Sequence, residues 1–495
     1  MRTSTSHPLQ IAEVQADEGQ GLIGITFCPG KKQASAATGS WNRDLALDVE
    51  AIRRWNAAAV VTLVEEHELE SLGVRDLGAA VVQAHMAWYH LPIRDAGVPG
   101  FAFEHAWREK GPELRAILRD GFNVLVHCKG GLGRAGTVAA RLLIELGVSD
   151  REAKDMVREA RPGAIETAEQ GAHLFCREEI PEEAPDRSDD AVLDRARGAL
   201  LGLAVGDAIG TTLEFTRRDS QPLLTDMTGG GPFGLEPGEW TDDTAMALAL
   251  AETFQSVGPF EDELMARFLK WYEEGENSCT GTCFDIGVTT RQALQRFKAS
   301  GNPIAGSTDP MSAGNGSLMR LAPVALRYLW DADKRRDHAA RQSRTTHGTP
   351  EAVDACVAFA DVLAETITGH PRSQVLRTRT GPYAGAIAPI MAGSWRGKAR
   401  DAIKSSGYVA HSLEAALWCV ARTGTFADAV LLAANLGDDA DTTAAITGQL
   451  AGALHGLSGI PPHWLERLAW NDLLLSTANL LHTMADMTAP DGEAG

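Results

Sequence analysis

The sequence has no uninterrupted apolar run of about 18 residues, which is the length that a transmembrane helix needs. Its first ten residues, MRTSTSHPLQ, lack the apolar core of a secretory signal peptide. Its cysteines are few and scattered, and their number, seven in 495 residues, is odd, which argues against a disulfide framework. We therefore expect a cytoplasmic protein that does not interact with a membrane.

Positive charge is also scarce. The chain has 46 lysines and arginines against 66 aspartates and glutamates, which gives a formal net charge of -20. This balance argues against non-specific binding to nucleic acid or to an anionic membrane, but it is compatible with a local basic pocket. We expect a small-molecule or protein substrate.

The length predicts two or three domains. The segment REEIPEEAPDRSDD, residues 177–190, is acidic and contains two prolines, and we interpret it as a linker. We expect an amino-terminal domain over residues 1–178, a linker over 179–192 and a second domain over 193–490. Apolar runs alternate with helical patterns in the first domain, which predicts an α/β fold with a mostly parallel sheet; alanine- and leucine-rich segments predict that the second is all-α.

One motif in the first domain predicts a phosphate cradle. In VLVHCKGGLGRAG, residues 124–136, an apolar strand leads to Cys128, and Arg134 opens the following helix. Between them lie the predicted substrate-binding residues Lys129, Gly130, Gly131 and Gly133. The glycines let backbone N–H groups converge on an anion, and a thiolate in such a loop can attack phosphorus. The alternative is a buried cysteine that merely ends a strand before a glycine turn.

The segment HLPIRDAG, residues 90–97, adds Asp95 on a loop that follows an apolar run. Together these residues resemble the protein tyrosine phosphatase superfamily, and most closely its small dual-specificity branch. The resemblance implies that Cys128 is the nucleophile, that Arg134 binds phosphate and that Asp95 is the general acid. The family usually has Ser or Thr directly after the arginine, where this chain has Ala135, so we expect slow release of phosphate from the cysteine.

Four polar segments interrupt the second half, namely GDAIGTTLEF (206–215), TDDT (241–244), GNGSLMR (314–320) and NLGDDADT (435–442). Two of them directly precede apolar helical patterns, so we interpret them as helix N-termini. Capping needs only one such side chain per helix, whereas these segments carry Asp242, Asp243, Asp438, Asp439 and Asp441. If the two helix starts converge, divalent cations would be needed to neutralise the carboxylates, and oxygen-only ligands favour Mg²⁺ or Mn²⁺ over Zn²⁺.

This arrangement resembles the ADP-ribosylglycohydrolase family, especially its bacterial branch that acts on modified dinitrogenase reductase, over residues 194–455. The resemblance implies a two-magnesium site, with Thr241, Asp242 and Asp243 as one half and Asp439, Asp441 and Thr442 as the other. It also implies that Glu214 lies near the scissile bond. The implied ligand contacts are Gly314, Asn315, Gly316 and Ser317 for the diphosphate, His347, and Tyr408 for adenine. A structural histidine and a core aromatic ring are the alternatives for the last two.

The sequence therefore predicts a bifunctional hydrolase. One activity removes ADP-ribose from a modified substrate, with arginine-linked protein favoured and serine, acetylated or nucleic-acid conjugates left open; the other hydrolyses a phosphate monoester through cysteine. The alternative is that one domain only binds ADP-ribose or phosphate and regulates the other. The family usually has glycine directly before the first aspartate of the second metal segment, whereas this chain has Asp438 there. Asp438 and Ala135 are the two features that favour a domain that only binds its ligand.

Overall fold

The computed structural model describes residues 1–36 and 39–487, so residues 488–490 of the predicted second domain lie outside the described residues. The chain divides into two compact units. Unit 1 comprises Met1–Glu183, Arg396–Ala399 and Ala421–Gly424, and unit 2 comprises Ala184–Trp395, Arg400–Val420 and Thr425–Gly495.

Unit 1 contains a five-stranded sheet in the order β1-β2-β7-β5-β6. The strands are β1 (Ala12–Val14), β2 (Ile23–Phe27), β5 (Ala57–Thr62), β6 (Ala87–His90) and β7 (Asn123–Cys128). Only β1 runs antiparallel to its neighbour. A separate ribbon pairs β3 (Lys32–Gln33) with β4 (Trp41–Asn42). The predicted α/β fold with a mostly parallel sheet is confirmed.

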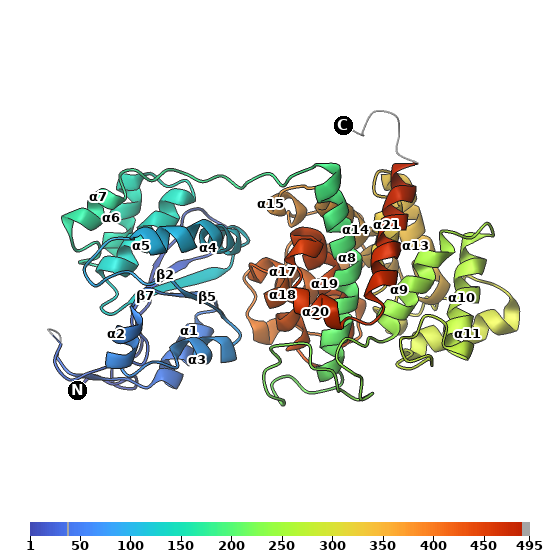
Figure 1. The fold of residues 1–495 in the computed structure, drawn as a ribbon, viewed down its shortest axis with the longest axis horizontal. Coiled ribbons are helices and arrows are strands. Elements are labelled where there is room, and N and C mark those ends of the chain that lie inside the picture. Colours follow the sequence, from blue (N-terminus) through green and yellow to red (C-terminus); the bar gives the residue numbers. More distant parts are fainter. Residues whose placement is uncertain (37–38, 488–495) are drawn as a thin grey trace. The chain divides into compact units, whose positions relative to one another are not determined.

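Helices cover both faces of this sheet, with α4 to α7 on one side and α1 to α3 on the other (Figure 1). Their bounds are α1 (Leu45–Arg54), α2 (Glu66–Ser71), α3 (Leu77–Gln83), α4 (Phe101–Arg119), α5 (Gly133–Glu145), α6 (Asp150–Ala160) and α7 (Ala168–His173). The central strand β7 is buried over its last five residues because both of its faces are covered, which explains its continuous apolar run. Cys128 therefore lies at the carboxyl end of a central parallel strand, where α/β proteins place their ligands.

Unit 2 is helical, as predicted. Its α-helices are α8 (Asp189–Gly210), α9 (Asp242–Thr253), α10 (Phe260–Glu274), α11 (Val288–Ser300), α12 (Ala322–Arg327), α13 (Ala332–Thr346), α14 (Pro350–Ile367), α15 (Arg372–Val375), α16 (Ile387–Met391), α17 (Val409–Arg422), α18 (Phe426–Ala434), α19 (Ala440–His455), α20 (Pro462–Arg467) and α21 (Asn471–Asp486). Short 3-10 helices are η1 (Thr211–Leu213), η2 (Pro310–Ser312), η3 (Arg400–Ala402) and η4 (Leu457–Gly459). Helix α8 begins within the segment that we interpret as a linker, with Ser188 as its N-cap.

Helices α8 and α19 pack backbone against backbone in unit 2. Four glycines of α8, spaced four residues apart, face small residues of α19. A Cβ atom added to them would lie 2.2 to 2.4 Å from backbone oxygens of α19, in the pairs Gly198–Gly452, Gly202–Gly448, Gly206–Ala444 and Gly210–Ala440. Only glycine permits this approach, and it brings Asp207 of α8 and Asp441 of α19 into one carboxylate cluster.

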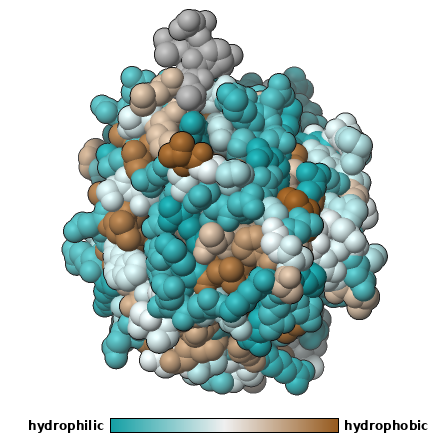
Figure 2. Space-filling model, turned by 90° about the vertical axis from the view of Figure 1, so that its right-hand side faces the viewer, coloured by the Kyte–Doolittle hydropathy of each residue, from teal (hydrophilic) through white to brown (hydrophobic). Residues whose placement is uncertain are grey.

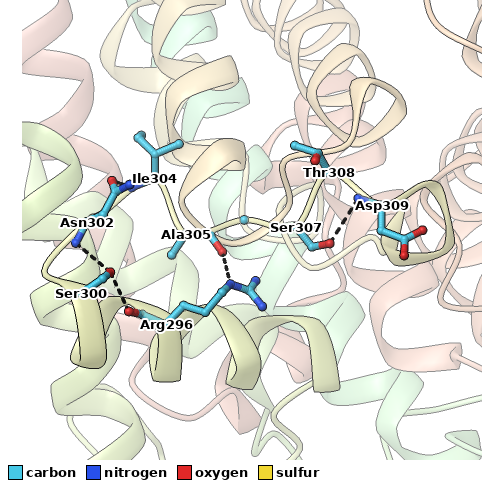
Figure 3. A pocket seen from close by; sticks show the side chains of 9 residues that line it. Arg296, Ser300, Asn302, Ile304, Ala305, Ser307, Thr308 and Asp309 are labelled. Carbon is cyan, nitrogen blue, oxygen red and sulfur yellow. Dashed lines mark hydrogen bonds between the residues drawn. The ribbon is translucent and has the colours of Figure 1, made fainter.

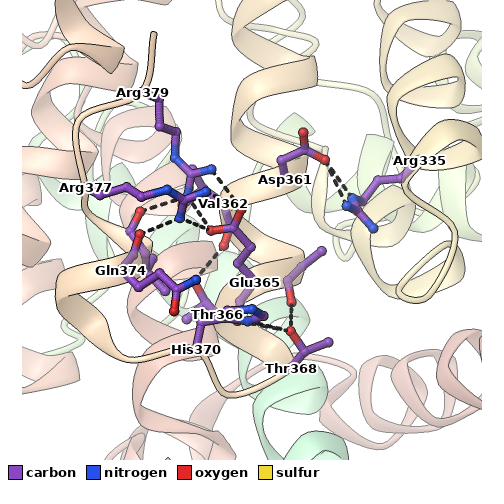
Figure 4. Close-up of polar contacts among 12 residues, drawn as sticks. Arg335, Asp361, Val362, Glu365, Thr366, Thr368, His370, Gln374, Arg377 and Arg379 are labelled. Carbon is purple, nitrogen blue, oxygen red and sulfur yellow. Dashed lines mark hydrogen bonds and ion pairs between the residues drawn. The ribbon is translucent and has the colours of Figure 1, made fainter. Parts of the chain in front are cut away.

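Ion pairs link helices α13 and α14 of unit 2 to each other and to the segment after α15. Glu365 near the end of α14 accepts hydrogen bonds from the guanidinium groups of Arg377 and Arg379, while Arg335 binds Asp361 (Figure 4). Burial by itself would raise the pKa of Glu365, but the two arginines outweigh it and lower that pKa to about 2. These pairs connect α13, α14 and the segment after α15.

The side of the molecule shown in Figure 2 is mostly hydrophilic, and the hydrophobic side chains on it form small separate patches. Within residues 1–36 and 39–487, we find no helix that is both long enough and apolar enough to cross a membrane.

We predict that Gly202→Ala destabilises the protein, because the new methyl group would lie 2.3 Å from the Gly448 carbonyl oxygen and would force α8 and α19 apart. Overpacking of this kind costs about 1–3 kcal/mol, which urea denaturation would measure. The matched control is Gly287→Ala, where a Cβ meets nothing within 4 Å. Equal stability of the two variants would contradict the proposed role of the glycines.

Candidate active sites

The loop after β7 forms a cradle around Cys128 in unit 1. The Gly131 N–H donates to Cys128 Sγ at 3.2 Å, and the sulfur atom is buried with its residue 3% exposed. Gly131 has a φ of +68°, and a Cβ there would lie 2.5 Å from the Phe27 backbone nitrogen. Glycine is therefore required at this position for the N–H to point at the sulfur atom.

Two basic side chains hold the outer surface of this loop. Lys31 Nζ donates to the Lys129 carbonyl oxygen at 3.1 Å, and Arg161 donates to the carbonyl oxygens of Gly131 at 3.1 Å and Gly130 at 3.4 Å. The N–H and C=O of a trans peptide point in opposite directions. Fixing these carbonyls outward therefore fixes the following N–H groups inward, which is the orientation seen for Gly131.

Lys31 is buried between aromatic rings, with Nζ 4.9 Å from the Phe27 ring centroid and 4.3 Å from that of Trp41. Burial lowers the pKa of Lys31 to about 8. Sequence reasoning missed both Lys31 and Arg161, because each lies about 30 residues or more from the loop whose carbonyls it binds.

Arg134 is held by a buried carboxylate that the sequence analysis also missed. Both oxygens of Glu68, on α2, accept from its guanidinium group at 2.5 and 3.0 Å. Arg134 also donates to Asp95 at 2.9 Å, so the structure brings the predicted acid to the predicted phosphate binder. Burial alone would raise the pKa of Glu68, but the hydrogen bonds from Arg134 outweigh it and lower that pKa.

The position after Arg134 offers no hydroxyl group. Ala135 is fully buried in the first turn of α5. The hydroxyl of Thr137, the next candidate along the helix, donates to the Gly133 carbonyl oxygen at 2.8 Å. That group is therefore engaged within its own helix.

A cluster of carboxylates forms the second candidate site, in unit 2. Oxygen atoms of Asp207, Asp243 and Asp441 lie within 4.8 Å of one another, and so do those of Glu214, Asp285 and Asp441. The two predicted half-sites meet here. The Thr241 hydroxyl lies 3.3 Å from Asp441 Oδ2, and the Thr442 hydroxyl lies 3.2 Å from Asp243 Oδ1.

Helix capping does not explain these residues. Thr241 is the N-cap of α9 and Asp439 that of α19, yet neither side chain makes a capping hydrogen bond. Instead, the start of α9 is bound by Asp207, which is fully buried and accepts from the N–H and hydroxyl groups of both Thr241 and Thr244 at 2.7–3.0 Å. An external carboxylate thus satisfies the positive end of the helix.

Sequence reasoning missed Asp207 and Asp285. Asp207 was visible as a lone acid within the apolar helix pattern around GDAIG. Asp285 had no such signal, since it lies in a loop before α11; its distinguishing feature is a left-handed backbone with a φ of +58°.

The cluster has the donors that a divalent cation needs. Burial, followed by repulsion between neighbouring carboxylates, raises the pKa values of Asp242, Asp243 and Asp441 well above their ordinary range. Among the described residues, Asp243 Oδ2, Asp441 Oδ1 and Glu214 Oε2 are buried without a hydrogen-bond partner. Buried oxygens of this kind fit Mg²⁺ or Mn²⁺, which bind oxygen ligands.

The pKa values of three further carboxyl groups of the site are also raised. Burial raises the pKa of Glu214 to about 10, that of Asp285 to about 7 and that of Asp439 to about 6. Asp438, in contrast, is exposed, and its backbone is left-handed with a φ of +56°. The extra carboxylate that the sequence placed in this segment therefore lies on the surface.

The predicted diphosphate loop adjoins the cluster. The amide of Asn315 donates to Asp439 Oδ2 at 2.5 Å, and Ser317 is buried against Ser343. His347 lies directly beneath the loop, because a Cβ on Gly316 would lie 2.6 Å from its ring. Burial lowers the pKa of His347 to about 3, so the ring is neutral near pH 7.

Tyr408 is half-buried beside this loop. Its hydroxyl donates to Glu351 at 2.7 Å, and its backbone pairs with that of Gly314. Its ring packs edge-on against His411. The predicted adenine contact therefore lies next to the predicted diphosphate loop.

Unit 2 also has hollows outside the cluster. One of about 580 Å³ lies between the end of α11 and residues 302–309, where Arg296 donates to the Ala305 carbonyl oxygen at 2.8 Å (Figure 3). Another, of about 680 Å³, lies beside α8, α14 and α21. Neither is lined by a predicted site residue.

We predict that Lys31→Met weakens the binding of inorganic tungstate, a phosphate mimic, about ten-fold at pH 7. The variant loses one positive charge and the hydrogen bond that holds the Lys129 carbonyl outward. Since the pKa of Lys31 is about 8, tungstate affinity of the unsubstituted protein falls as the pH rises through 8 and the difference between the two proteins shrinks. Calorimetry would measure both. Lys32→Met, at an exposed neighbour, is the control, and an equal effect there would contradict this role.

Comparison with known proteins supports two domain assignments. The ADP-ribosylglycohydrolase family model matches residues 188–490, and that of the Swiss Army Knife protein DSP-PTPase phosphatase domain matches residues 43–174. An ADP-ribosylarginine hydrolase Tri1 of Pseudomonas putida is 48% identical over 301 residues, which cover 60% of this chain and 80% of that protein.

Two further relatives agree. A solved structure described as an ADP-ribosylglycohydrolase-related protein complex is 39% identical, with a TM-score of 0.53, and the match covers 60% of this chain and 99% of that one. Rat cyclin-dependent kinase inhibitor 3 is 30% identical over 169 residues, which cover 34% of this chain and 74% of that protein. The chain belongs to the ADP-ribosylglycohydrolase family and carries a DSP-PTPase phosphatase-like domain ahead of its glycohydrolase domain.

Proposed function

We propose that unit 2 is a Mg²⁺-dependent hydrolase that removes ADP-ribose from modified arginine in a protein. The observation that carries this proposal is the set of buried carboxylate oxygens without hydrogen-bond partners on α9, on α19 and at Glu214, which lie in one cluster with Asp207 of α8 and Asp285. The likeness to an ADP-ribosylarginine hydrolase favours arginine over serine or nucleic-acid conjugates. The proposed metal ligands are Thr241, Asp242, Asp243, Asp439, Asp441 and Thr442.

The roles of the residues follow from their positions. Two bound Mg²⁺ ions would offset the carboxylate charges and bind the ribose hydroxyl groups; Mn²⁺ would fit the same oxygens. Residues Gly314 to Ser317 hold the diphosphate, and Tyr408 lies against adenine. Cations bound in the cluster would favour the charged form of Glu214 over the protonated form that burial favours. The ionised Glu214 would orient the water and take its proton as the water oxygen bonds to the anomeric carbon. The bond from that carbon to the guanidino nitrogen breaks, and the nitrogen gains the proton that Glu214 took from the water.

For unit 1 we propose phosphate monoester hydrolysis. Cys128 attacks phosphorus, the N–H groups of the loop and Arg134 bind the phosphate oxygens, and Asp95 protonates the leaving oxygen. Glu68 fixes the orientation of Arg134 through two hydrogen bonds. Because no hydroxyl group lies directly after Arg134, the second step, hydrolysis of the phosphocysteine, is slow.

A second candidate function is that unit 1 acts as a phosphate-binding module that regulates the hydrolase. The buried Ala135 favours it, since binding does not need the missing hydroxyl group. Its substrate or ligand would be a phosphorylated molecule. The exposed Asp438 lends little support to the same interpretation of unit 2, because it lies outside the carboxylate cluster.

We predict that Asp242→Asn and Asp441→Asn each lower ADP-ribose release from an arginine-modified protein at least about 100-fold, since buried charge stabilisation at a reacting centre is worth that much. Chelator should abolish release by the unsubstituted protein, and Mg²⁺ should restore it. The matched control is Asp472→Asn, at an exposed carboxylate in the first turn of α21. Release that persists with chelator would contradict the metal, and ADP-ribose binding without any release would favour a binding module.

We predict that Cys128→Ser abolishes hydrolysis of p-nitrophenyl phosphate, whereas Ala135→Ser raises the steady-state rate about ten-fold by supplying the missing hydroxyl group. Stopped-flow absorbance should show a burst of p-nitrophenol in the unsubstituted protein and a smaller burst in Ala135→Ser. Binding of phosphate without turnover in both proteins would favour the regulatory module.

A further inference from the structure

Three phenylalanine rings adjoin the carboxylate cluster, and we name them the aromatic rim: Phe215, Phe233 and Phe284. The ring centroid of Phe233 lies 6.4 Å from that of Phe215 and 5.1 Å from that of Phe284. Phe215 is 67% exposed, and the other two are half-buried. Contiguous exposed aromatic surface of this kind is typical of a binding surface.

The rim is tied to the cluster by the chain itself. Phe215 directly follows Glu214, and Phe284 directly precedes Asp285. The carboxylates of Glu214 and Asp285 meet in the cluster while the neighbouring rings gather around Phe233. The reacting centre and the rim are therefore one residue apart along two separate segments.

The backbone is strained where it turns from the cluster to the rim. Phe215 has a φ of +55°, a value that a bulky residue rarely adopts, whereas aspartate tolerates the left-handed φ of +58° at Asp285. The Phe215 N–H donates at 2.7 Å to the carbonyl oxygen of Asp438, whose φ is +56°. Strain of this kind persists where the surrounding structure fixes it, and it concentrates at ligand-binding sites.

The cluster is joined to two different groups. Asp439 is bound by Asn315, from the loop proposed to hold the diphosphate. Glu214 and Asp285 are instead continuous with the rim. A substrate whose anomeric carbon lies at Glu214 and Asp285 therefore has the bond to its leaving group close to the rim.

We propose that the aromatic rim binds the guanidinium group and aliphatic stem of the modified arginine; this inference rests on the proposed function. The guanidinium group of arginine is cationic and planar, and it is attracted to the faces of aromatic rings. An O-linked serine conjugate has no cation for the rings to bind. The rim thus selects arginine linkages.

The test compares the arginine-linked substrate with free ADP-ribose, which lacks the leaving group. With the full chain and Mg²⁺, Phe215→Ala and Phe284→Ala should each raise KM for ADP-ribosyl-arginine about five-fold, with kcat changed less than two-fold, because one cation–π contact is lost. Phe215→Tyr should retain the KM of the unsubstituted protein, and Phe215→Leu should behave like alanine. The dissociation constant of free ADP-ribose, measured by calorimetry, should not change.

Three results would overturn the inference: unchanged KM in both alanine variants, an equal loss of ADP-ribose affinity, or full retention by Phe215→Leu. Phe284→Ala keeps the test decisive if the strained position 215 does not tolerate alanine. Failure of the proposed function would give a different result. The unsubstituted protein and all rim variants would then release no ADP-ribose from arginine.

Discussion

The contact between α8 and α19 is the constraint on which the glycohydrolase site depends. Glycines on α8 allow the two helices to approach until backbone touches backbone. This approach brings Asp207 and Asp441 into one cluster, and Asp207 in turn binds the start of α9, which carries Asp242 and Asp243. A larger side chain at the contact would separate the helices and with them the carboxylates.

In unit 1, the phosphate-binding loop depends on the orientation of its peptide groups. The loop has to present N–H groups to an anion, and the carbonyls on the other side of the same peptides are bound by Lys31 and Arg161. Glu68 likewise fixes the orientation of the Arg134 side chain by accepting hydrogen bonds from its guanidinium group. In both units, polar groups from distant segments hold the residues that face the ligand, which limits the rearrangement needed on binding.

Local patterns predicted much of this structure. The order of elements on either side of Cys128 follows from one apolar run, three glycines and an amphipathic segment. The family resemblance also predicted that two acidic helix starts form one site; the number of their carboxylates, too many for capping, indicated a cation only on the condition that they converge. The supporting residues Glu68, Lys31 and Asp285 were not predicted, because a lone charged residue looks the same in sequence whether it faces water or a buried partner.

The sequence by itself determined the two fold classes, the family resemblances and most of the residues that we propose to act on the ligands, because those properties depend on short-range spacing and on residue chemistry. Only the tertiary structure decided which charges meet. It paired Glu68 with Arg134, joined Asp207 to the start of α9, left Asp438 on the surface and gathered three phenylalanines beside the carboxylates. Such pairings depend on the packing of segments far apart in the chain, which no local pattern encodes.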